Sequence, residues 1–156
     1  MFGKAASLLV GVLVGVLVAV AVGGSSSRAA TGPAQIKITD REVRVVRVDV
    51  GARGTSPGDI EVIHYRLFNR RVTKNAIGRA ELHCTFVDGG RARLCQGTYF
   101  LPRGKLMVAG SMRFRQFYDL AVVGGTGLYD NARGTLTVTR THTRPIRNLV
   151  LFRLVG

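Results

Sequence analysis

The sequence predicts an all-β protein: an eight-stranded antiparallel β-barrel that follows an N-terminal signal segment. After residue 30, apolar and polar residues alternate with the period of two that is typical of strands, and no segment shows helical periodicity. Turn sequences such as GARGTSPGD, DGGR, LPRG and GGTG separate the alternating segments. Eight closely spaced strands can close into a barrel, which leaves no exposed sheet edge. A sandwich of two sheets is the alternative.

The strands are expected to follow one another at short intervals in a single domain, residues 31–156. Turn residues, chiefly glycine, proline and aspartate, bound most of them. The expected strands span residues 42–50, 59–68, 76–88, 91–100, 105–114, 118–123, 132–141 and 147–155.

Residues 5–22, AASLLVGVLVGVLVAVAV, form an uncharged apolar run that follows Lys4 and precedes the small polar stretch GGSSSRAATG. A basic residue, an apolar run and small residues in this order indicate an export signal. The run is also just long enough to span a bilayer, so residues 1–30 are either a cleaved signal peptide with a short polar linker or a membrane anchor. The protein is therefore expected to be secreted or extracytoplasmic, with residues 5–22 as its anchor if the segment is not cleaved.

The chain is strongly basic. It carries 23 Lys and Arg residues against 9 Asp and Glu residues, a formal net charge of +14, and most of the basic residues are arginine. This charge is expected to attract anionic cell-envelope surfaces in a salt-dependent way. Nucleic acid is not an expected partner, because the protein is exported and has no tryptophan for base stacking. The preference for arginine over lysine suggests a GC-rich bacterial genome.

The DGGR turn fixes the pairing of both cysteines. If its two glycines form a two-residue hairpin turn, Asp88 faces Arg91 and Cys84 lies directly opposite Cys95. In an exported protein this predicts a Cys84–Cys95 disulfide, worth about 2 to 3 kcal/mol on a loop-entropy model. A pair of buried free thiols is the alternative. The cysteines and histidines have no spacing typical of metal ligands, so no metal site is expected.

Alternation in the same hairpin assigns the two faces of the sheet. The outward set is expected to be Arg79, Glu81, His83 and Thr85. The inward set is expected to be Ala80, Leu82, Cys84, Phe86 and Tyr99, joined from the next strand by Leu106, Val108, Gly110, Met112 and Phe114. The residues expected to line a ligand cavity are Tyr65, Leu82, Cys84, Phe86, Tyr99 and Met112.

Residues 121–134, AVVGGTGLYDNARG, contain a cluster of glycines. A phosphate-binding loop is excluded, because Gly127 is followed by Leu128 and Tyr129 instead of lysine and a hydroxyl residue. A dinucleotide-binding loop is excluded too, because the following GTLTVTRTHT alternates like a strand and does not form a helix. The glycines are therefore expected to adopt positive φ angles at a tight corner between two strands.

The order of these segments resembles a known family. GDIEVIHYRLFN, IGRAELHC, CQGTYFLPRG, KLMVAGSM and AVVGGTGLYDNARG, over roughly residues 40–156, are similar to segments of the allene oxide cyclase barrel superfamily. VVGGTG-x-Y-x-x-ARG is closer to the signature of its dirigent branch. The resemblance implies an eight-stranded barrel with a largely apolar cavity, a dimeric or trimeric assembly, and no metal or organic cofactor. Such barrels hold a reactive molecule in one geometry and exclude water.

The resemblance also assigns individual residues. Cys84 looks aligned with a pocket-lining cysteine of the cyclases, and Arg133 with the arginine of the ARG motif near the dirigent pocket. Tyr65 and Met112 stand where the cyclase pocket has an asparagine and a tyrosine, which argues against allene oxide cyclase activity. A leucine replaces the acidic residue that some dirigent proteins carry directly after GGTG, and Asp130 follows two residues later. The expected catalytic residues are Tyr65, Asp130 and Arg133.

The expected function is an exported barrel that binds a small apolar or phenolic molecule and steers its cyclisation or stereoselective coupling without a cofactor. If the protein is an enzyme, it is a cofactor-independent cyclase or a dirigent-type auxiliary. Two alternatives stay open. The same cavity could serve a non-catalytic, lipocalin-like carrier, because the pattern places no acid–base pair inside the barrel. A barrel filled by side chains could instead belong to a basic structural protein of the cell surface.

Overall fold

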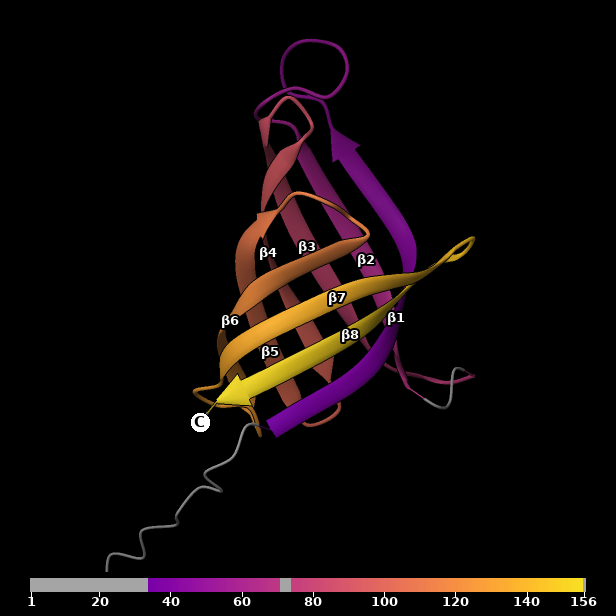
Figure 1. Ribbon diagram of the computed structural model, residues 1–156, viewed down its shortest axis with the longest axis vertical. Coiled ribbons are helices and arrows are strands. Elements are labelled where there is room, and N and C mark those ends of the chain that lie inside the picture. Colours follow the sequence, from indigo (N-terminus) through magenta and orange to yellow (C-terminus); the bar gives the residue numbers. More distant parts are fainter. Residues whose placement is uncertain (1–33, 71–73, 156) are drawn as a thin grey trace, which may run out of the picture.

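The computed structural model describes residues 34–70 and 74–155, and the expected signal segment lies outside this range. Eight antiparallel strands form a closed barrel, in which each strand pairs with its neighbours in the sequence and the last pairs with the first (Figure 1). The predicted fold class is therefore confirmed. The strands are β1 (Ala34–Val48), β2 (Ile60–Asn69), β3 (Ala76–Asp88), β4 (Ala92–Leu101), β5 (Gly104–Met112), β6 (Phe117–Gly127), β7 (Arg133–Thr143) and β8 (Ile146–Val155).

The alternating pattern builds the barrel, because it gives each strand an apolar face toward the interior. In Figure 1, β6, β7 and β8 form a front wall that crosses the rear wall of β2 to β5 at a steep angle, while β1 closes the side. Within the described ranges, no helix is long and apolar enough to cross a membrane.

The β3–β4 hairpin carries the predicted disulfide. Cys84 lies opposite Cys95, and their sulfur atoms are bonded. The turn differs from the prediction: Asp88 lies opposite Ala92 and not Arg91, because the register shifts before the turn. One extra residue is accommodated there as a β-bulge, which leaves the pairing of the cysteines unchanged.

The predicted inward face is confirmed along most of its length. Phe114 is the exception, because β5 ends at Met112 and Phe114 is 66% exposed in the segment that leads to β6. The alternating pattern continues in the sequence past the point where the chain leaves the sheet. The predicted inward residues that are buried are Ala80, Leu82, Cys84, Phe86, Tyr99, Leu106, Val108 and Met112.

The glycine motif forms the end of β6. The strand runs through GGTG to Gly127, and residues 128–132 form the turn to β7. Gly127 has a φ angle of 66° and Asn131 a φ angle of 58°, a region that glycine and asparagine enter most readily. The predicted positive-φ corner is right for Gly127 and wrong for Gly124 and Gly125, which are strand residues without positive φ.

Strand β1 begins at Ala34 and not at residue 42, and its early part brings a polar residue into the barrel. Ile38 and Asp40 are both inward and buried, with exposed fractions of 4% and 1%. A register shift between Glu42 and Arg44 interrupts the ladder to β2 just beyond them. The interior is therefore not wholly apolar.

Candidate functional site

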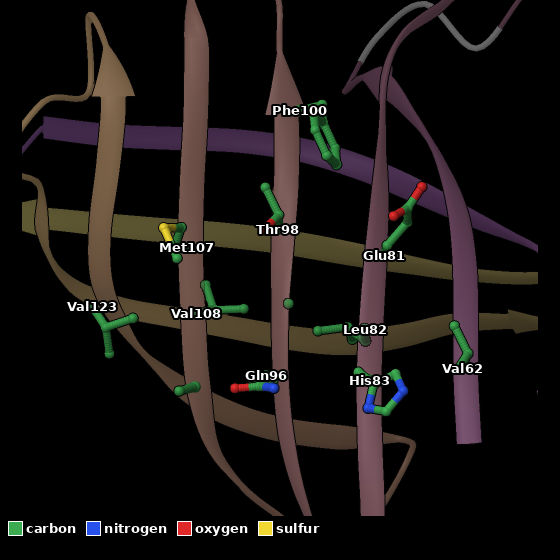
Figure 2. Close-up of a pocket in the computed structure, with 12 residues that line it drawn as sticks. Val62, Glu81, Leu82, His83, Gln96, Thr98, Phe100, Met107, Val108 and Val123 are labelled. Carbon is green, nitrogen blue, oxygen red and sulfur yellow. The ribbon is translucent and has the colours of Figure 1, made fainter. Parts of the chain in front are cut away.

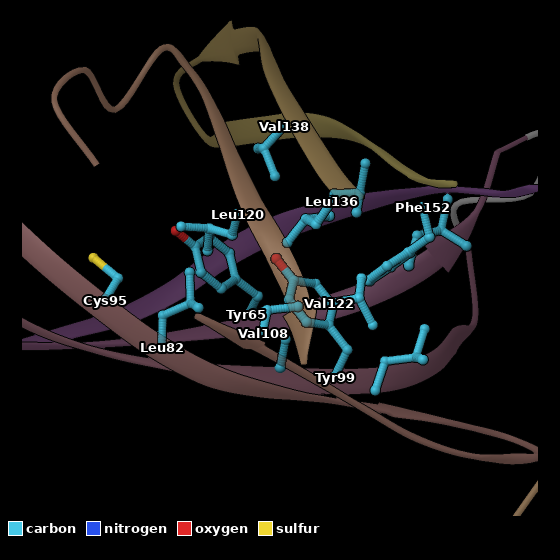
Figure 3. Close-up of a cluster of buried hydrophobic side chains, with 14 of the residues drawn as sticks. Tyr65, Leu82, Cys95, Tyr99, Val108, Leu120, Val122, Leu136, Val138 and Phe152 are labelled. Atoms are coloured by element: carbon cyan, nitrogen blue, oxygen red, sulfur yellow. The ribbon is translucent and has the colours of Figure 1, made fainter. Parts of the chain in front are cut away.

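Five polar side chains from five strands lie together in the otherwise apolar interior. Each occupies an inward position and is at most 5% exposed. Two of them, Tyr65 and Tyr99, lie among Leu82, Leu136 and Phe152 (Figure 3). This set, called the interior cluster below, consists of Asp40 of β1, Tyr65 of β2, Tyr99 of β4, Tyr118 of β6 and Asn148 of β8.

Asp40 supplies the acidic group of the interior cluster. Asn148 Nδ2 donates a hydrogen bond of 2.6 Å to Asp40 Oδ1. Asp40 Oδ2 and Asn148 Oδ1 form no hydrogen bond with the described protein groups. Burial raises the pKa of Asp40 from 3.8 to about 7, although the hydrogen bonds from Asn148 oppose the shift. Near neutral pH this carboxyl group can accept or donate a proton.

The three tyrosines of the cluster are neutral hydrogen-bond donors. Burial is the main reason why the pKa values of Tyr65, Tyr99 and Tyr118 are raised, and the nearby Asp40 carboxyl adds to the effect. An edge-to-face contact with Phe152, 5.1 Å between ring centroids, holds the Tyr99 ring. The Tyr118 hydroxyl lies close enough to interact with those of Tyr65 and Tyr99. The hydroxyls of Tyr99 and Tyr118 nevertheless form no well-aligned hydrogen bond within the described residues. Both can therefore serve a polar atom of a bound molecule.

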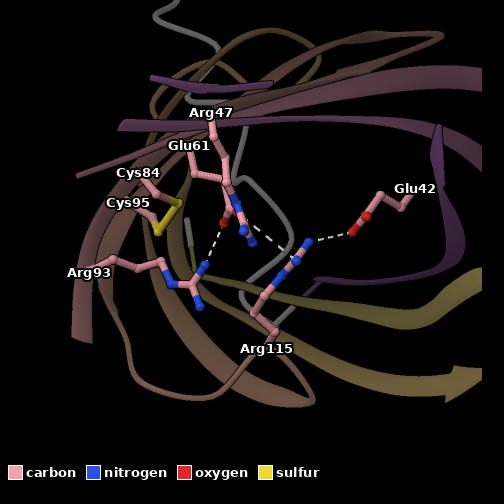
Figure 4. Close-up of polar contacts among 7 residues, drawn as sticks. All are labelled: Glu42, Arg47, Glu61, Cys84, Arg93, Cys95 and Arg115. Atoms are coloured by element: carbon pink, nitrogen blue, oxygen red, sulfur yellow. Dashed lines mark hydrogen bonds and ion pairs between the residues drawn. A yellow bond between two sulfur atoms is a disulfide. The ribbon is translucent and has the colours of Figure 1, made fainter. Parts of the chain in front are cut away.

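A second polar layer, the ion layer, closes the barrel end beside the disulfide (Figure 4). Glu61 is fully buried there: Arg93 donates to its Oε2, and Arg47 Nε donates to its Oε1 over 3.0 Å. Arg115 bridges two carboxylates, with Nη2 2.5 Å from Glu42 Oε2 and Nη1 3.8 Å from Glu61 Oε1. Three guanidinium groups thus offset the cost of burying the Glu61 charge.

Arg115 links the ion layer to the interior cluster. It belongs to residues 113–116, the Arg115 loop, which connect β5 to β6. Burial alone would lower the pKa of Arg115, but its attraction to Glu61 and Glu42 outweighs burial and raises it. Its guanidinium also interacts with the Tyr65 hydroxyl and so connects the two groups of polar residues.

All six predicted lining residues are buried, and all but Phe86 belong to one hydrophobic core cluster. Their role in ligand binding stays a prediction. Tyr65 and Tyr99 belong to the interior cluster. Cys84 is in the disulfide, and the Phe86 ring lies 4.8 Å from the guanidinium carbon of Arg93 in the ion layer. Exposed fractions of at most 6% are found for Tyr65, Leu82, Cys84, Phe86, Tyr99 and Met112.

Asp130 and Arg133, predicted with Tyr65 as catalytic residues, lie on the outside. Both are exposed, Asp130 in the turn after β6 and Arg133 at the start of β7. Asn131 Nδ2 donates to Asp130 Oδ2 over 3.3 Å, and Arg133 Nη1 donates to the Ala132 carbonyl over 2.9 Å. The structure does not bring these two side chains together with the buried Tyr65. Their catalytic role stays a prediction.

Sequence reasoning missed five buried polar residues of the strands. Each stands two positions from a buried apolar residue of the same strand, as Asp40 does from Ile38. A polar residue at an inward position of an alternating strand is the signal that could have found them. The missed residues are Asp40, Glu61, Arg93, Tyr118 and Asn148.

A groove of about 420 Å³ lies on the outer face of β3, β4 and β5 (Figure 2). Glu81, His83, Gln96 and Met107 line it, and all four are exposed. Across residues 34–70 and 74–155, no three His, Cys, Asp or Glu side chains come together as a potential metal site. The interior cluster is the stronger candidate for chemistry, because its polar groups are buried and four of their atoms form no well-aligned hydrogen bond.

No protein-family model and no curated protein matches the chain. Several solved structures do. A pyocyanin demethylase is 22% identical, with a TM-score of 0.67 over 78% of this chain and 100% of that one. A pterocarpan synthase dirigent protein is 15% identical, with a TM-score of 0.60 over 78% of this chain and 87% of that one. A Diels–Alderase from Streptomyces koyangensis is 13% identical, with a TM-score of 0.59 over 80% of this chain and 70% of that one.

At these identities the similarity establishes the fold. All three comparisons cover most of the described barrel. The chain therefore has the barrel fold of the dirigent proteins, as its sequence resemblance predicted, and this fold is shared by the Diels–Alderase.

Proposed function

We propose that the barrel interior binds a small, largely apolar molecule with a carbonyl or phenolic oxygen and steers its cyclisation or coupling. One observation carries this proposal. Asp40 Oδ2 and Asn148 Oδ1 form no hydrogen bond with the described protein groups, and the hydroxyls of Tyr99 and Tyr118 form no well-aligned one. A buried polar group without a partner costs about 1 to 3 kcal/mol, which a polar atom of a bound molecule can recover.

The cluster offers the chemistry that such a reaction needs. With a pKa of about 7, Asp40 can take a proton from the bound molecule and return it at another atom. The neutral hydroxyls of Tyr99 and Tyr118 can donate hydrogen bonds to an oxygen that gains negative charge. The surrounding apolar side chains would hold the rest of the molecule in a folded shape and keep water away.

The Arg115 loop is the proposed entrance. Side chains fill much of the interior, and fully buried residues include Leu82, Tyr99 and Phe152. A ligand must therefore displace a side chain at one end of the barrel. Arg115 is suited to this displacement, because Glu61 remains paired with Arg93 and Arg47 when the Arg115 side chain moves away.

Similar barrels support a role in small-molecule chemistry. The structural neighbours are named as a demethylase of pyocyanin, a pterocarpan synthase and a Diels–Alderase. From these proteins we carry one property over to this chain: the barrel serves as a site for a small molecule. The buried disulfide also supports the proposal that the domain works in an oxidising, extracytoplasmic compartment.

Native mass spectrometry of the full chain tests the proposal. The probes are pyocyanin, simple phenols and conjugated dienones, each incubated with wild type, Asp40→Asn and Asp130→Asn. We expect a stoichiometric adduct with one probe class, lost or weakened in Asp40→Asn and retained in Asp130→Asn, because only Asp40 is buried in the cluster.

Native spectra combined with chromatography of the released probe separate a carrier from an enzyme. A probe that changes mass or chromatographic retention over time with wild type, but not with Asp40→Asn, indicates catalysis. A probe that is bound and recovered unchanged indicates a carrier. Binding that is equally strong in wild type and Asp40→Asn would contradict the assignment of the interior cluster.

A further inference from the structure

The register of the barrel places basic residues of different strands side by side on the outer surface. Each residue of this line is the direct cross-strand partner of the next. Cross-strand partners lie about 5 Å apart, so the line is continuous. Across β8, β1, β2, β3, β4 and β5 it reads Arg147, Arg41, Arg66, Arg79, Phe100 and Lys105, called the arginine row below.

The arginine row faces away from the barrel interior. Arg147, Arg66 and Arg79 are exposed, and Arg41 is half-buried over the Phe68 ring at 5.5 Å. The aromatic member of the row is covered by its basic neighbours. The Arg79 guanidinium lies 4.1 Å from the centroid of its ring, and the Lys105 ammonium 5.4 Å.

The row concentrates positive charge that the protein itself does not neutralise. Like charges directly opposite one another destabilise a sheet. Glu81 Oε1 lies 3.7 Å from Arg79 Nε. Arg41, Arg66 and Arg147 form no ion pair with a carboxylate in the described ranges, which contain all 9 acidic residues of the chain. An anion from outside the protein would supply the missing negative charge.

We propose that the arginine row binds a flexible, linear polymer that carries phosphate groups. Guanidinium forks bind phosphate through paired hydrogen bonds. A tetrahedral phosphate offers oxygens to arginines on both of its sides, which suits guanidinium groups that are closely spaced along a line. This site is separate from the interior cluster and does not depend on its function.

The shape of the row selects among anionic partners. It crosses six of the eight strands of a closed barrel, so it curves around more than half of the wall (Figure 1). A flexible chain can follow this curve, whereas a flat bilayer touches only part of it. Arg79 and Lys105 lie against the ring of Phe100, which is only partly exposed, and these contacts compete with stacking on a nucleobase. This favours a polymer without bases.

Two charge-matched double variants of the full chain test this site. Arg41→Gln/Arg66→Gln removes two adjacent members of the row. Arg91→Gln/Arg153→Gln removes two exposed arginines outside it, Arg91 in the β3–β4 turn and Arg153 opposite Gln35 and Thr135. Affinity for medium-chain inorganic polyphosphate is measured by isothermal titration calorimetry over a range of salt concentrations. Phosphatidylglycerol vesicles and oligothymidylate serve as competing partners.

We expect wild type to bind polyphosphate, the row variant to bind roughly tenfold more weakly, and the control variant to stay within about twofold of wild type. The row variant should depend less on salt: the slope of log affinity against log salt concentration should be smaller in magnitude than that of wild type by about two. The row variant should also melt at a higher temperature than the control, because it loses like-charge repulsion. Equal losses in both variants, no binding by wild type, or row-dependent binding of vesicles or oligothymidylate in preference to polyphosphate would overturn the proposal.

Discussion

Asp40 makes the stability of the protein depend on pH in an unusual direction. Its pKa is about 7 in the folded chain and about 3.8 when the carboxyl is unperturbed. The folded state therefore binds more protons than the unfolded state between about pH 4 and pH 7, and the Asp40 contribution to stability falls as pH rises through this window.

We predict that Asp40→Asn removes this contribution. Relative to wild type, the variant should gain roughly 4 kcal/mol in free energy of unfolding at pH 8 and little at pH 4. Urea unfolding at several pH values measures the difference, with the exposed Asp130→Asn as the control. A gain that is the same at all pH values would contradict the raised pKa.

The Tyr99 hydroxyl is buried and interacts with the Tyr118 hydroxyl without a well-aligned hydrogen bond, so we predict that its removal affects ligand binding more than stability. Tyr99→Phe should change the free energy of unfolding by less than about 1 kcal/mol, since a weak interaction is lost. It should weaken binding of the small-molecule ligand by roughly fivefold to tenfold. Thermal unfolding and titration of the ligand give the two quantities, and Tyr129→Phe, outside the cluster, is the control. Unchanged binding by Tyr99→Phe would exclude a contact between this hydroxyl and the ligand.

At the scale of elements, a disulfide between Cys84 and Cys95, which are 11 positions apart in the sequence, cross-links the β3–β4 hairpin. We predict that Cys84→Ala/Cys95→Ala lowers the free energy of unfolding by about 2 to 4 kcal/mol, because the unfolded chain regains loop entropy. Urea unfolding measures it, and the reduced wild type should show a similar loss. If both lose less than about 0.5 kcal/mol, the disulfide does not stabilise the barrel.

The Arg115 loop controls access to the interior in our account. We predict that Arg115→Gln speeds ligand association severalfold without unfolding the barrel, because Glu61 keeps Arg93 and Arg47 as partners. Stopped-flow tyrosine fluorescence measures the rate, since the chain has no tryptophan. Arg113→Gln, in the same loop but exposed, is the control. Equal rates in wild type and Arg115→Gln would place the entrance elsewhere.

The sequence predicted elements well where alternation was clean and poorly where a strand carried an inward polar residue. The hairpin register followed from DGGR and placed Cys84 opposite Cys95. The early part of β1 was missed because Asp40 occupies an inward position and interrupts the apolar pattern. Phe114 continued the alternating pattern past the end of β5, where no pattern marks that the chain turns away.

At the scale of the whole molecule, barrel closure creates the site. Asp40 and Asn148 are 108 positions apart and become hydrogen-bonded only because β1 pairs with β8. Alternation tells which residues face inward, but not which inward residues meet across the interior. Tyr65 and Tyr99 could therefore be predicted as lining residues, while their association with Asp40 could not.

The central claim is that the interior cluster holds the small molecule, and ¹³C NMR of tyrosine-labelled protein tests it most directly. The chain has four tyrosines, three in the cluster and Tyr129 outside it. Addition of a ligand that binds in native mass spectrometry should shift the resonances of Tyr65, Tyr99 and Tyr118 and leave Tyr129 in place. Binding that shifts only Tyr129, or none of the four, would contradict the account.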